Sequence, residues 1–180
     1  NYFFIIFIMK DDIINAKKLL NKNRRGHHTI PSNNLYPHQW SWDSAWIIYG
    51  YCITKEFEKA ENEMYSLFNY QWSNGLVPSI VFHNLENNTY FPGPNVWELN
   101  STASHLTKNI STTGIVQPPL HASACLKLYE YSKNKDFLIK IYPKLLKWHK
   151  YLYNERDIND EGLVYIRHPW ESGMDNSPIW

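Results

Sequence analysis

The sequence is poor in several features that mark whole classes of protein. It has two cysteines, Cys52 and Cys125, in 180 residues, too few for a disulfide framework, and its 8 histidines lack the spacing of known zinc motifs. Charged residues make up 19% and the net charge is +1, so no strong field attracts nucleic acid or an acidic membrane. Glycine-rich phosphate loops, βαβ alternation and heptad repeats are also missing. We therefore expect no nucleic-acid or membrane partner, no metal site and no cofactor.

Long hydrophobic runs are missing as well. The longest run, residues 2–9, is far shorter than the roughly 20 residues that span a bilayer. It also lacks the basic start and the small-residue cleavage site of a signal peptide, so we expect a cytoplasmic protein. Because more ordinary sequence begins at Met9, we take Met9 as the true start and expect residues 1–10 to be a non-native or disordered segment.

Aromatic residues, in contrast, are abundant. They make up 16% of the chain and include 8 Trp and 13 Tyr. Filling of the hydrophobic core is one explanation, and composition alone favours it. The alternative is a surface that stacks on, and hydrogen-bonds with, a polyhydroxylated ligand.

Hydrophobic periodicity predicts a mostly helical chain. Helical patterns cover five segments, residues 11–21, 43–52, 55–70, 117–131 and 135–153. Short extended pieces are expected at residues 77–82 and 163–166. Ser177 followed by Pro178 is typical of an N-cap and first helical position, which predicts the start of a further helix.

Three polar and aromatic clusters precede helical segments, at residues 36–43, 113–117 and 168–175. The intervals between them are each long enough for one inward and one outward helix. Stacked helix hairpins with alternate helices inside would place all three clusters on one rim. This arrangement predicts a shared site at that rim.

The third cluster holds two carboxylates, Glu171 and Asp175, beside Trp170. One interpretation of Asp175 is a capping carboxylate near a helix start. The other is a general acid, which protonates a leaving oxygen when aromatic burial and a neighbouring carboxylate keep a carboxyl group protonated. Both interpretations stay open on these residues alone.

The other two clusters allow the same choice between structure and ligand binding. Trp40 and Trp42 either pack over the following helix or present their faces to a sugar ring, and Asp43 either caps that helix or accepts hydrogen bonds from hydroxyls. Gln117 either caps the helix that begins near Pro118 or binds a hydroxyl group.

Five motifs, in this order, resemble one enzyme family. They are PSNNLYPHQWSWDSA at residues 31–45, GLVP at 75–78, FPGP at 91–94, TGIVQPP at 113–119 and HPWESGMDNSP at 168–178. Together they resemble the mannosylglycerate and glucosylglycerate hydrolases of glycoside hydrolase family 63. The ESGMD element is also similar to that of trehalases.

The resemblance implies the first half of an (α/α)6 barrel, all-α with short extended segments in its loops. It implies that residues 11–180 are the N-terminal part of the catalytic domain of an inverting hydrolase of α-glucosyl or α-mannosyl bonds, with a small carbohydrate as substrate. Carried over, Asp175 is the general acid, and Glu171 is a supporting residue that hydrogen-bonds nearby and perturbs it. The substrate-binding residues implied are Tyr36, Trp40, Trp42, Asp43, Tyr90 (toward glycerate), Gln117, Trp170 and Gly173.

The sequence departs from the family pattern at two points. Ser79 stands where the family has a histidine that contacts the sugar. The family's general base is a glutamate of the C-terminal half, which we expect beyond Trp180, so the 180-residue chain alone is expected to be inactive. The alternatives are a trehalase-like or oligosaccharide-processing α-glucosidase, or a non-catalytic sugar-binding remnant.

Overall fold

The computed structural model describes residues 2–83, 90–97 and 112–180, and it confirms a mostly helical chain. The helices are α1 (Tyr2–Asn23), α2 (Ser41–Ile53), α3 (Phe57–Phe68), α4 (His121–Ser132) and α5 (Lys135–Arg156), with short 3₁₀ turns η1 (Pro94–Trp97) and η3 (Pro169–Ser172). Four two-residue strands form two antiparallel ladders, β1 (Arg24–Arg25) with β2 (His28–Thr29), and β3 (Gln39–Trp40) with β4 (Ile80–Val81). In the part of the chain that is described, no helix is long and apolar enough to cross a membrane.

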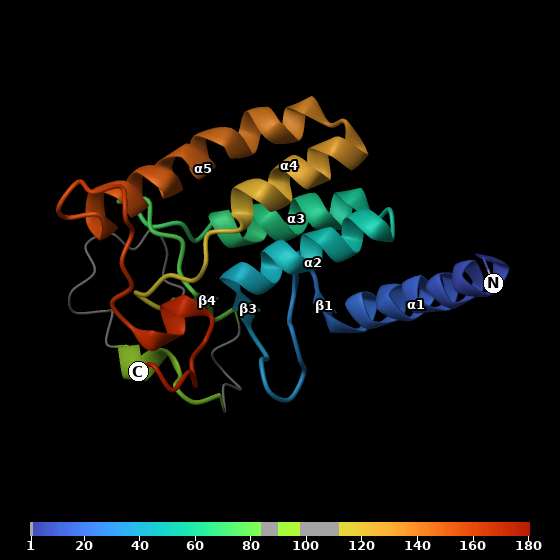
Figure 1. Ribbon diagram of the computed structural model, residues 1–180, viewed down its shortest axis with the longest axis horizontal. Helices are drawn as coiled ribbons and strands as arrows, with labels where there is room; N and C mark the ends of the chain where they lie inside the picture. The colour runs from blue at the N-terminus through green and yellow to red at the C-terminus, as the bar shows by residue number, and fades with distance from the viewer. Residues whose placement is uncertain (1, 84–89, 98–111) are drawn as a thin grey trace.

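The helices α2 to α5 stack as two neighbouring pairs (Figure 1). Helix α2 packs against both α3 and α4, and α4 packs in turn against α5. The loops that precede α2 and α4, and the segment that follows α5, gather at one end of this stack (Figure 1). The arrangement therefore brings the three polar clusters to one end, as the stacked-hairpin pattern predicts.

One hydrophobic core joins the four stacked helices. Amphipathic stripes supply it, such as Ala60, Met64 and Leu67 on α3, all fully buried. The aromatic rings Tyr51, Phe68, Phe137 and Trp148 are also buried there. Core filling thus accounts for a part of the aromatic excess.

The boundaries of α2 and α3 lie within two residues of the pattern-based expectation, and those of α1, α4 and α5 differ by more. Helix α1 begins at Tyr2 rather than near residue 11. Helix α4 begins at His121 rather than at 117, because Pro118 and Pro119 precede the helix instead of forming its first turn. Helix α5 begins as expected, where the Asn134 side chain accepts hydrogen bonds from two first-turn amides, and it runs on to Arg156.

Two expectations near the C-terminus were wrong. A short strand was expected at residues 163–166, but these residues are exposed and form no strand within the described ranges. Their backbone is held to α5 by the Tyr165 N–H, which donates to the Arg156 carbonyl at 2.9 Å. Residues 177–180 form turns instead of a helix, although the Ile179 N–H donates to Ser177 Oγ at 3.4 Å, as it would at an N-cap.

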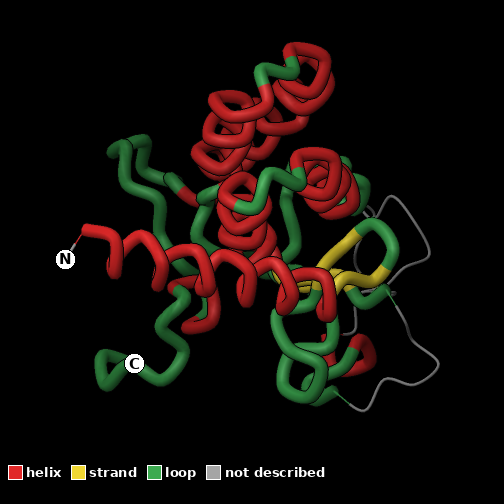
Figure 2. Tube along the Cα trace, turned by 90° about the vertical axis from the view of Figure 1, so that its right-hand side faces the viewer, coloured by secondary structure: helices red, strands yellow, loops and turns green. Residues whose placement is uncertain are grey.

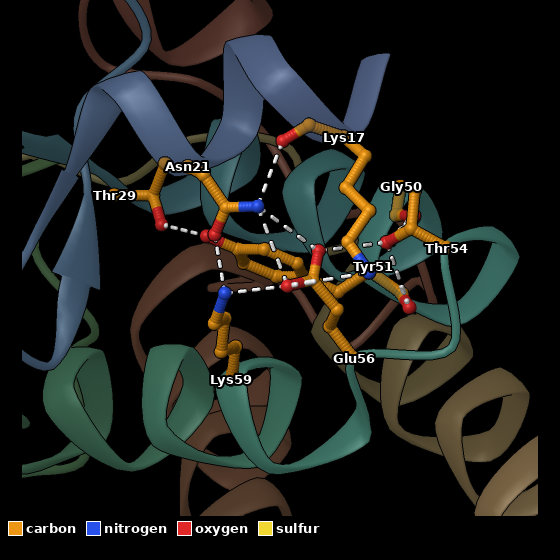
Figure 3. A network of polar contacts seen from close by, with 8 residues as sticks. All are labelled: Lys17, Asn21, Thr29, Gly50, Tyr51, Thr54, Glu56 and Lys59. Carbon is orange, nitrogen blue, oxygen red and sulfur yellow. Dashed lines mark hydrogen bonds and ion pairs between the residues drawn. The ribbon is translucent and has the colours of Figure 1, made fainter. Parts of the chain in front are cut away.

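Helix α1 lies apart from the stack and meets it at one place (Figures 1 and 2). A polar network around Glu56 joins α1 to the α2–α3 connection (Figure 3). The Glu56 carboxylate accepts from Asn21 of α1 at 3.4 Å and from Thr54 at 3.2 Å. Beside it, Leu20 packs over Gly50, where a Cβ would meet Leu20 Cδ1 at 3.0 Å. This contact attaches α1 to the end of α2 remote from the polar clusters.

Candidate active site

A pocket of about 230 Å³ opens at the N-terminal end of α2. It brings together residues from all three clusters, and seven of the ten residues implied by the family resemblance line it. The lining residues are Tyr36, Trp40, Trp42, Asp43, Gln117, Gly173 and Asp175. Segments up to 139 residues apart in the sequence (175 − 36) therefore share one cavity.

The first wall is the junction of β3 with α2. Trp40 is 7% exposed and is the last residue of β3. Its ring is met edge-on by Tyr36 and by Tyr90, each with a centroid distance of 5.3 Å. These contacts hold the indole in place at the pocket, where a tryptophan ring can stack on the C–H face of a sugar.

Gln117 fixes the first turn of α2 across this cavity. Its side-chain Oε1 accepts a hydrogen bond from the backbone N–H of Trp42 at 3.1 Å. That N–H is one of the donors that a helix N-terminus leaves without an intrahelical partner. Gln117 is therefore a cap, but for α2 rather than for its own helix, and its side-chain amide N–H₂ still adjoins the cavity.

Asp43 lies inside the first turn of α2 and is not its N-cap, which is Trp40. Burial raises the pKa of Asp43 to about 6, although a bond from its own backbone N–H acts in the opposite direction. The group thus changes charge close to neutral pH, within a cavity that also holds Asp175. The Asp43 and Asp175 carboxyl groups thus both line one cavity, where a carboxyl group can accept hydrogen bonds from a bound sugar or donate a proton to it.

Gly173 lets the third cluster approach Trp42. Its φ is +71°, and a Cβ there would lie 2.7 Å from the Trp42 indole. Only glycine fits both the backbone conformation and this space. The chain then leads from Gly173 to Asp175, which is exposed at the pocket.

Glu171 lies behind the pocket in a buried ion pair. Both of its oxygens accept from Arg156 at 2.7 Å, and the backbone N–H groups of Val116 and Arg167 donate to them at 3.1 and 2.6 Å. Burial acts to raise its pKa, but these four bonds outweigh burial, and the pKa of Glu171 lies below its ordinary value. The pair ties the segments that carry Gln117 and Asp175 to the end of α5.

Three of the implied site residues lie outside the pocket lining. Tyr90 packs against Trp40. Trp170 packs on Trp97, with ring centroids 5.9 Å apart. Glu171 holds the pocket segments through Arg156 rather than meeting the cavity itself.

Ser79 is also away from the cavity. It is 3% exposed, and its hydroxyl lies 2.6 Å from that of Thr113. At this position the serine is a buried link between β4 and the second cluster. A contact from residue 79 to a sugar, as a histidine makes in the family, is not part of this geometry.

Arg156 is a residue of the site that the sequence patterns did not predict. Its charge and its neighbour Glu155 are typical of a solvated helix end. Periodicity could have revealed it, because Arg156 continues the buried stripe of α5 that runs through Trp148 and Leu152 at spacings of four. A charge on an apolar stripe indicates a buried partner.

A second cavity, of about 490 Å³, is larger. It lies between the β1–β2 hairpin and α3, and its lining includes Arg25 and the stacked rings of His28 and His83 but no carboxylate. We place the candidate site at the smaller pocket because the two carboxyl groups are there. In the described ranges, no group of three or more His, Cys, Asp or Glu side chains is placed to hold a metal ion.

The chain is similar in sequence to known proteins over most of its length. Residues 36–180 match the family described as the mannosylglycerate hydrolase MGH1-like glycoside hydrolase domain. The chain is 47% identical over 176 residues to the mannosylglycerate hydrolase of Rubrobacter radiotolerans, covering 96% of this chain and 39% of that protein. It is 39% identical over 174 residues to the glucosylglycerate hydrolase of Mycolicibacterium hassiacum, covering 92% and 39%.

A solved structure shares the fold. The family 63 mannosylglycerate hydrolase of Thermus thermophilus, crystallised with Tris and D-glycerate, superposes with a TM-score of 0.81 at 44% identity, over 92% of this chain and 38% of that one. The same Thermus protein has also been crystallised with glucose, and that structure matches with a TM-score of 0.76 at 42% identity, over 93% and 39%. The chain thus spans less than half the length of the relatives it matches. It belongs to the MGH1-like family of glycoside hydrolase domains, the mannosylglycerate and glucosylglycerate hydrolase group of family 63.

Proposed function

We propose that the chain forms the N-terminal part of the catalytic domain of an inverting glycoside hydrolase that cleaves an α-mannosyl or α-glucosyl bond to glycerate. The observation that carries the proposal is the convergence of three sequence-distant segments on one pocket with two carboxyl groups and two tryptophans. The relatives are a mannosylglycerate and a glucosylglycerate hydrolase, and a related structure was solved with D-glycerate. In the proposed whole domain, α2 and α4 are inner helices and α3 and α5 outer helices of an (α/α)6 barrel.

Asp175 is the proposed general acid, which donates its proton to the glycosidic oxygen as the bond breaks. Trp40 and Trp42 stack on the glycosyl unit, and Asp43 and Gln117 bind its hydroxyls. Asp43 accepts best as a carboxylate, so we expect sugar affinity to fall as pH is lowered through about 6, the raised pKa of Asp43.

An inverting mechanism needs a second carboxylate as base, about 6.5–9.5 Å from the acid across the sugar. We propose that this base comes from the part of the relatives that the 180-residue chain does not span. The 180 residues alone then bind sugar without hydrolysing it.

Hydrolysis tests the proposal directly. The full-length protein is assayed against mannosylglycerate, glucosylglycerate and trehalose, beside the 180-residue chain. We expect release of sugar from one of the two glycerate substrates by the full-length protein only, and its loss in Asp175→Asn. Release from trehalose alone identifies a trehalase-like enzyme, and binding without hydrolysis of any substrate identifies a sugar-binding module.

Binding of glucose tests the pocket separately from hydrolysis. Trp42→Ala should abolish it, whereas Trp46→Ala should not, since Trp46 lies one turn further along α2, is 56% exposed and is outside the pocket. Equal losses in the two variants would contradict the placement of the sugar.

A further inference from the structure

The side chain of Gln39 is completely buried, and every polar atom of it is bonded. Its Nε2 donates to Glu63 Oε1 at 2.9 Å and to the Glu63 carbonyl at 3.1 Å, and it lies 3.2 Å from Ser44 Oγ. Its Oε1 accepts from Ser66 Oγ at 3.2 Å and is 2.8 Å from His83 Nε2. One amide therefore links β3 to α2, to α3 and to the chain that follows β4.

The partners fix which way round this amide lies. Glu63 Oε1 accepts from Ser44 Oγ at 2.7 Å as well as from Gln39, so it is an acceptor whether or not the other oxygen carries a proton. The amide nitrogen must then face Glu63, and the amide oxygen must face His83. It follows that His83 Nε2 carries the hydrogen and donates it to Gln39.

The residues next to this network are pocket residues. Trp40 follows Gln39 directly in β3, and Asp43 precedes Ser44 in α2. Both ends of the turn that carries Trp40, Trp42 and Asp43 are thus anchored on the same Glu63 carboxyl group. No atom of Gln39 is exposed, and it does not line the pocket.

We propose that Gln39 is a positioning residue of the candidate site, whose amide, held by Glu63, Ser66 and His83, fixes the β3–α2 junction so that the Trp40 and Trp42 rings and the Asp43 carboxyl group face one sugar. The proposal rests on the proposed function for the identity of the ligand. The positioning itself does not, because the buried contacts exist without ligand. A ring held in place before binding loses less freedom on binding, so the contribution of Gln39 is to affinity through its neighbours.

The test compares Gln39→Ala with Gln71→Ala in the full-length protein. Gln71 is a matched control because it is 8% exposed and its Nε2 also donates to two acceptors, the backbone carbonyls of Gly75 and Lys144, neither of which lines the pocket. Both variants lose a buried glutamine and should lose stability. Only Gln39→Ala should move the indole N–H resonances of Trp40 and Trp42 in spectra of ¹⁵N-tryptophan-labelled protein.

Two further measurements complete the test. Glucose titration should show about tenfold weaker binding for Gln39→Ala than for Gln71→Ala, because only the former loses preorganised rings. The ¹⁵N signature of His83 should be that of the neutral Nε2–H tautomer in the parent protein. The opposite tautomer would overturn the assigned direction of the amide and with it the proposal.

The possible outcomes separate this proposal from the proposed function. If the parent protein binds neither glucose nor mannose and hydrolyses neither glycerate substrate, the proposed function is wrong, while the indole resonances still decide the role of Gln39. Unmoved resonances, or equal shifts in both glutamine variants, would overturn the positioning role. If Gln39→Ala does not fold, Ser66→Ala decides, since it removes a single donor to Gln39 and should shift the same two resonances by less; no shift there also overturns the role.

Discussion

Two fully buried glutamates each hold a segment that lines the pocket, and they are stabilised differently. Glu63 behind the β3–α2 wall accepts from the neutral groups of Gln39 and Ser44, and burial raises its pKa to about 7. Glu171 behind the wall of the second and third clusters faces the Arg156 guanidinium, and its pKa is lowered. The first is a carboxyl group that is readily protonated, and the second is a permanent anion.

The difference follows from what each glutamate holds. Glu63 fastens a continuous stretch, residues 39–44, to α3, and neutral hydrogen bonds of about 1 kcal/mol each are enough for that. Glu171 connects α5 with the segments of the second and third clusters. No short stretch of backbone holds these three parts together, so the ion pair must do so. Charged, bidentate hydrogen bonds are stronger and more directional, and suit that task.

Breaking the ion pair should have the largest effect. Glu171→Ala leaves the Arg156 guanidinium, 2% exposed, without its partner, and we expect a loss of about 3–5 kcal/mol in the free energy of unfolding. Chemical denaturation measures it. Glu155→Ala is the control, since Glu155 is the exposed neighbour of Arg156 on the same helix, and its loss should stay below about 0.5 kcal/mol. Similar losses in the two variants would show that the pair does not hold the wall.

The pH dependence of stability should distinguish the two glutamates. Between pH 4.5 and about 7, folded Glu63 keeps its proton while the unfolded chain loses it, so its contribution to stability falls as pH rises, by up to about 3 kcal/mol. Glu63→Gln removes this decline, and the variant should gain stability relative to the parent between pH 5 and pH 8.

Glu171→Gln provides the contrast in the same window. Because the folded pKa of Glu171 lies below its ordinary value, its contribution is complete above pH 4.5 and is lost only in more acidic solution. The stability difference between parent and Glu171→Gln should therefore stay constant from pH 5 to pH 8. A constant difference for Glu63→Gln as well would contradict a raised pKa for Glu63.

The two walls also differ in how far the sequence predicted them. The stretch with Trp40, Trp42 and Asp43 is contiguous and stands before a clear helical pattern, so its place at the start of a helix followed from local rules, while its role in a sugar site was implied by the family resemblance. The pairing of Arg156 with Glu171 depends on where α5 ends relative to the third cluster, a tertiary relation that no local pattern contains. For the same reason the helical segments were predicted well, while Gln117 could not be recognised as the cap of a helix 75 residues away (117 − 42).

Disturbing the contact between Gly173 and Trp42, where the two walls meet, should have an intermediate effect on stability. Gly173→Ala places a methyl group 2.7 Å from Trp42 and forces a positive φ, whereas Gly162→Ala forces a similar φ of +75° with nothing within 4 Å. Both should lose about 1 kcal/mol to backbone strain, and Gly173→Ala about 1–3 kcal/mol more. Thermal unfolding gives the stability, and glucose titration should show weakened binding in Gly173→Ala only. Equal behaviour would mean that the Trp42 ring is free to move aside.

The smallest expected effect distinguishes a charged acceptor from a neutral one. Ser44→Ala removes one donor to Glu63, and Ser79→Ala removes an equally buried hydroxyl whose partner is the neutral Thr113. Each should lose about 1 kcal/mol of stability at pH 5. At pH 8, where Glu63 is ionised, the loss in Ser44→Ala should grow, because a hydrogen bond to a charged group is the stronger one. The loss in Ser79→Ala should stay the same, since neither hydroxyl titrates. Denaturation of both variants at the two pH values measures the difference, and a loss in Ser44→Ala that is independent of pH would mean that Glu63 keeps one charge state throughout this range.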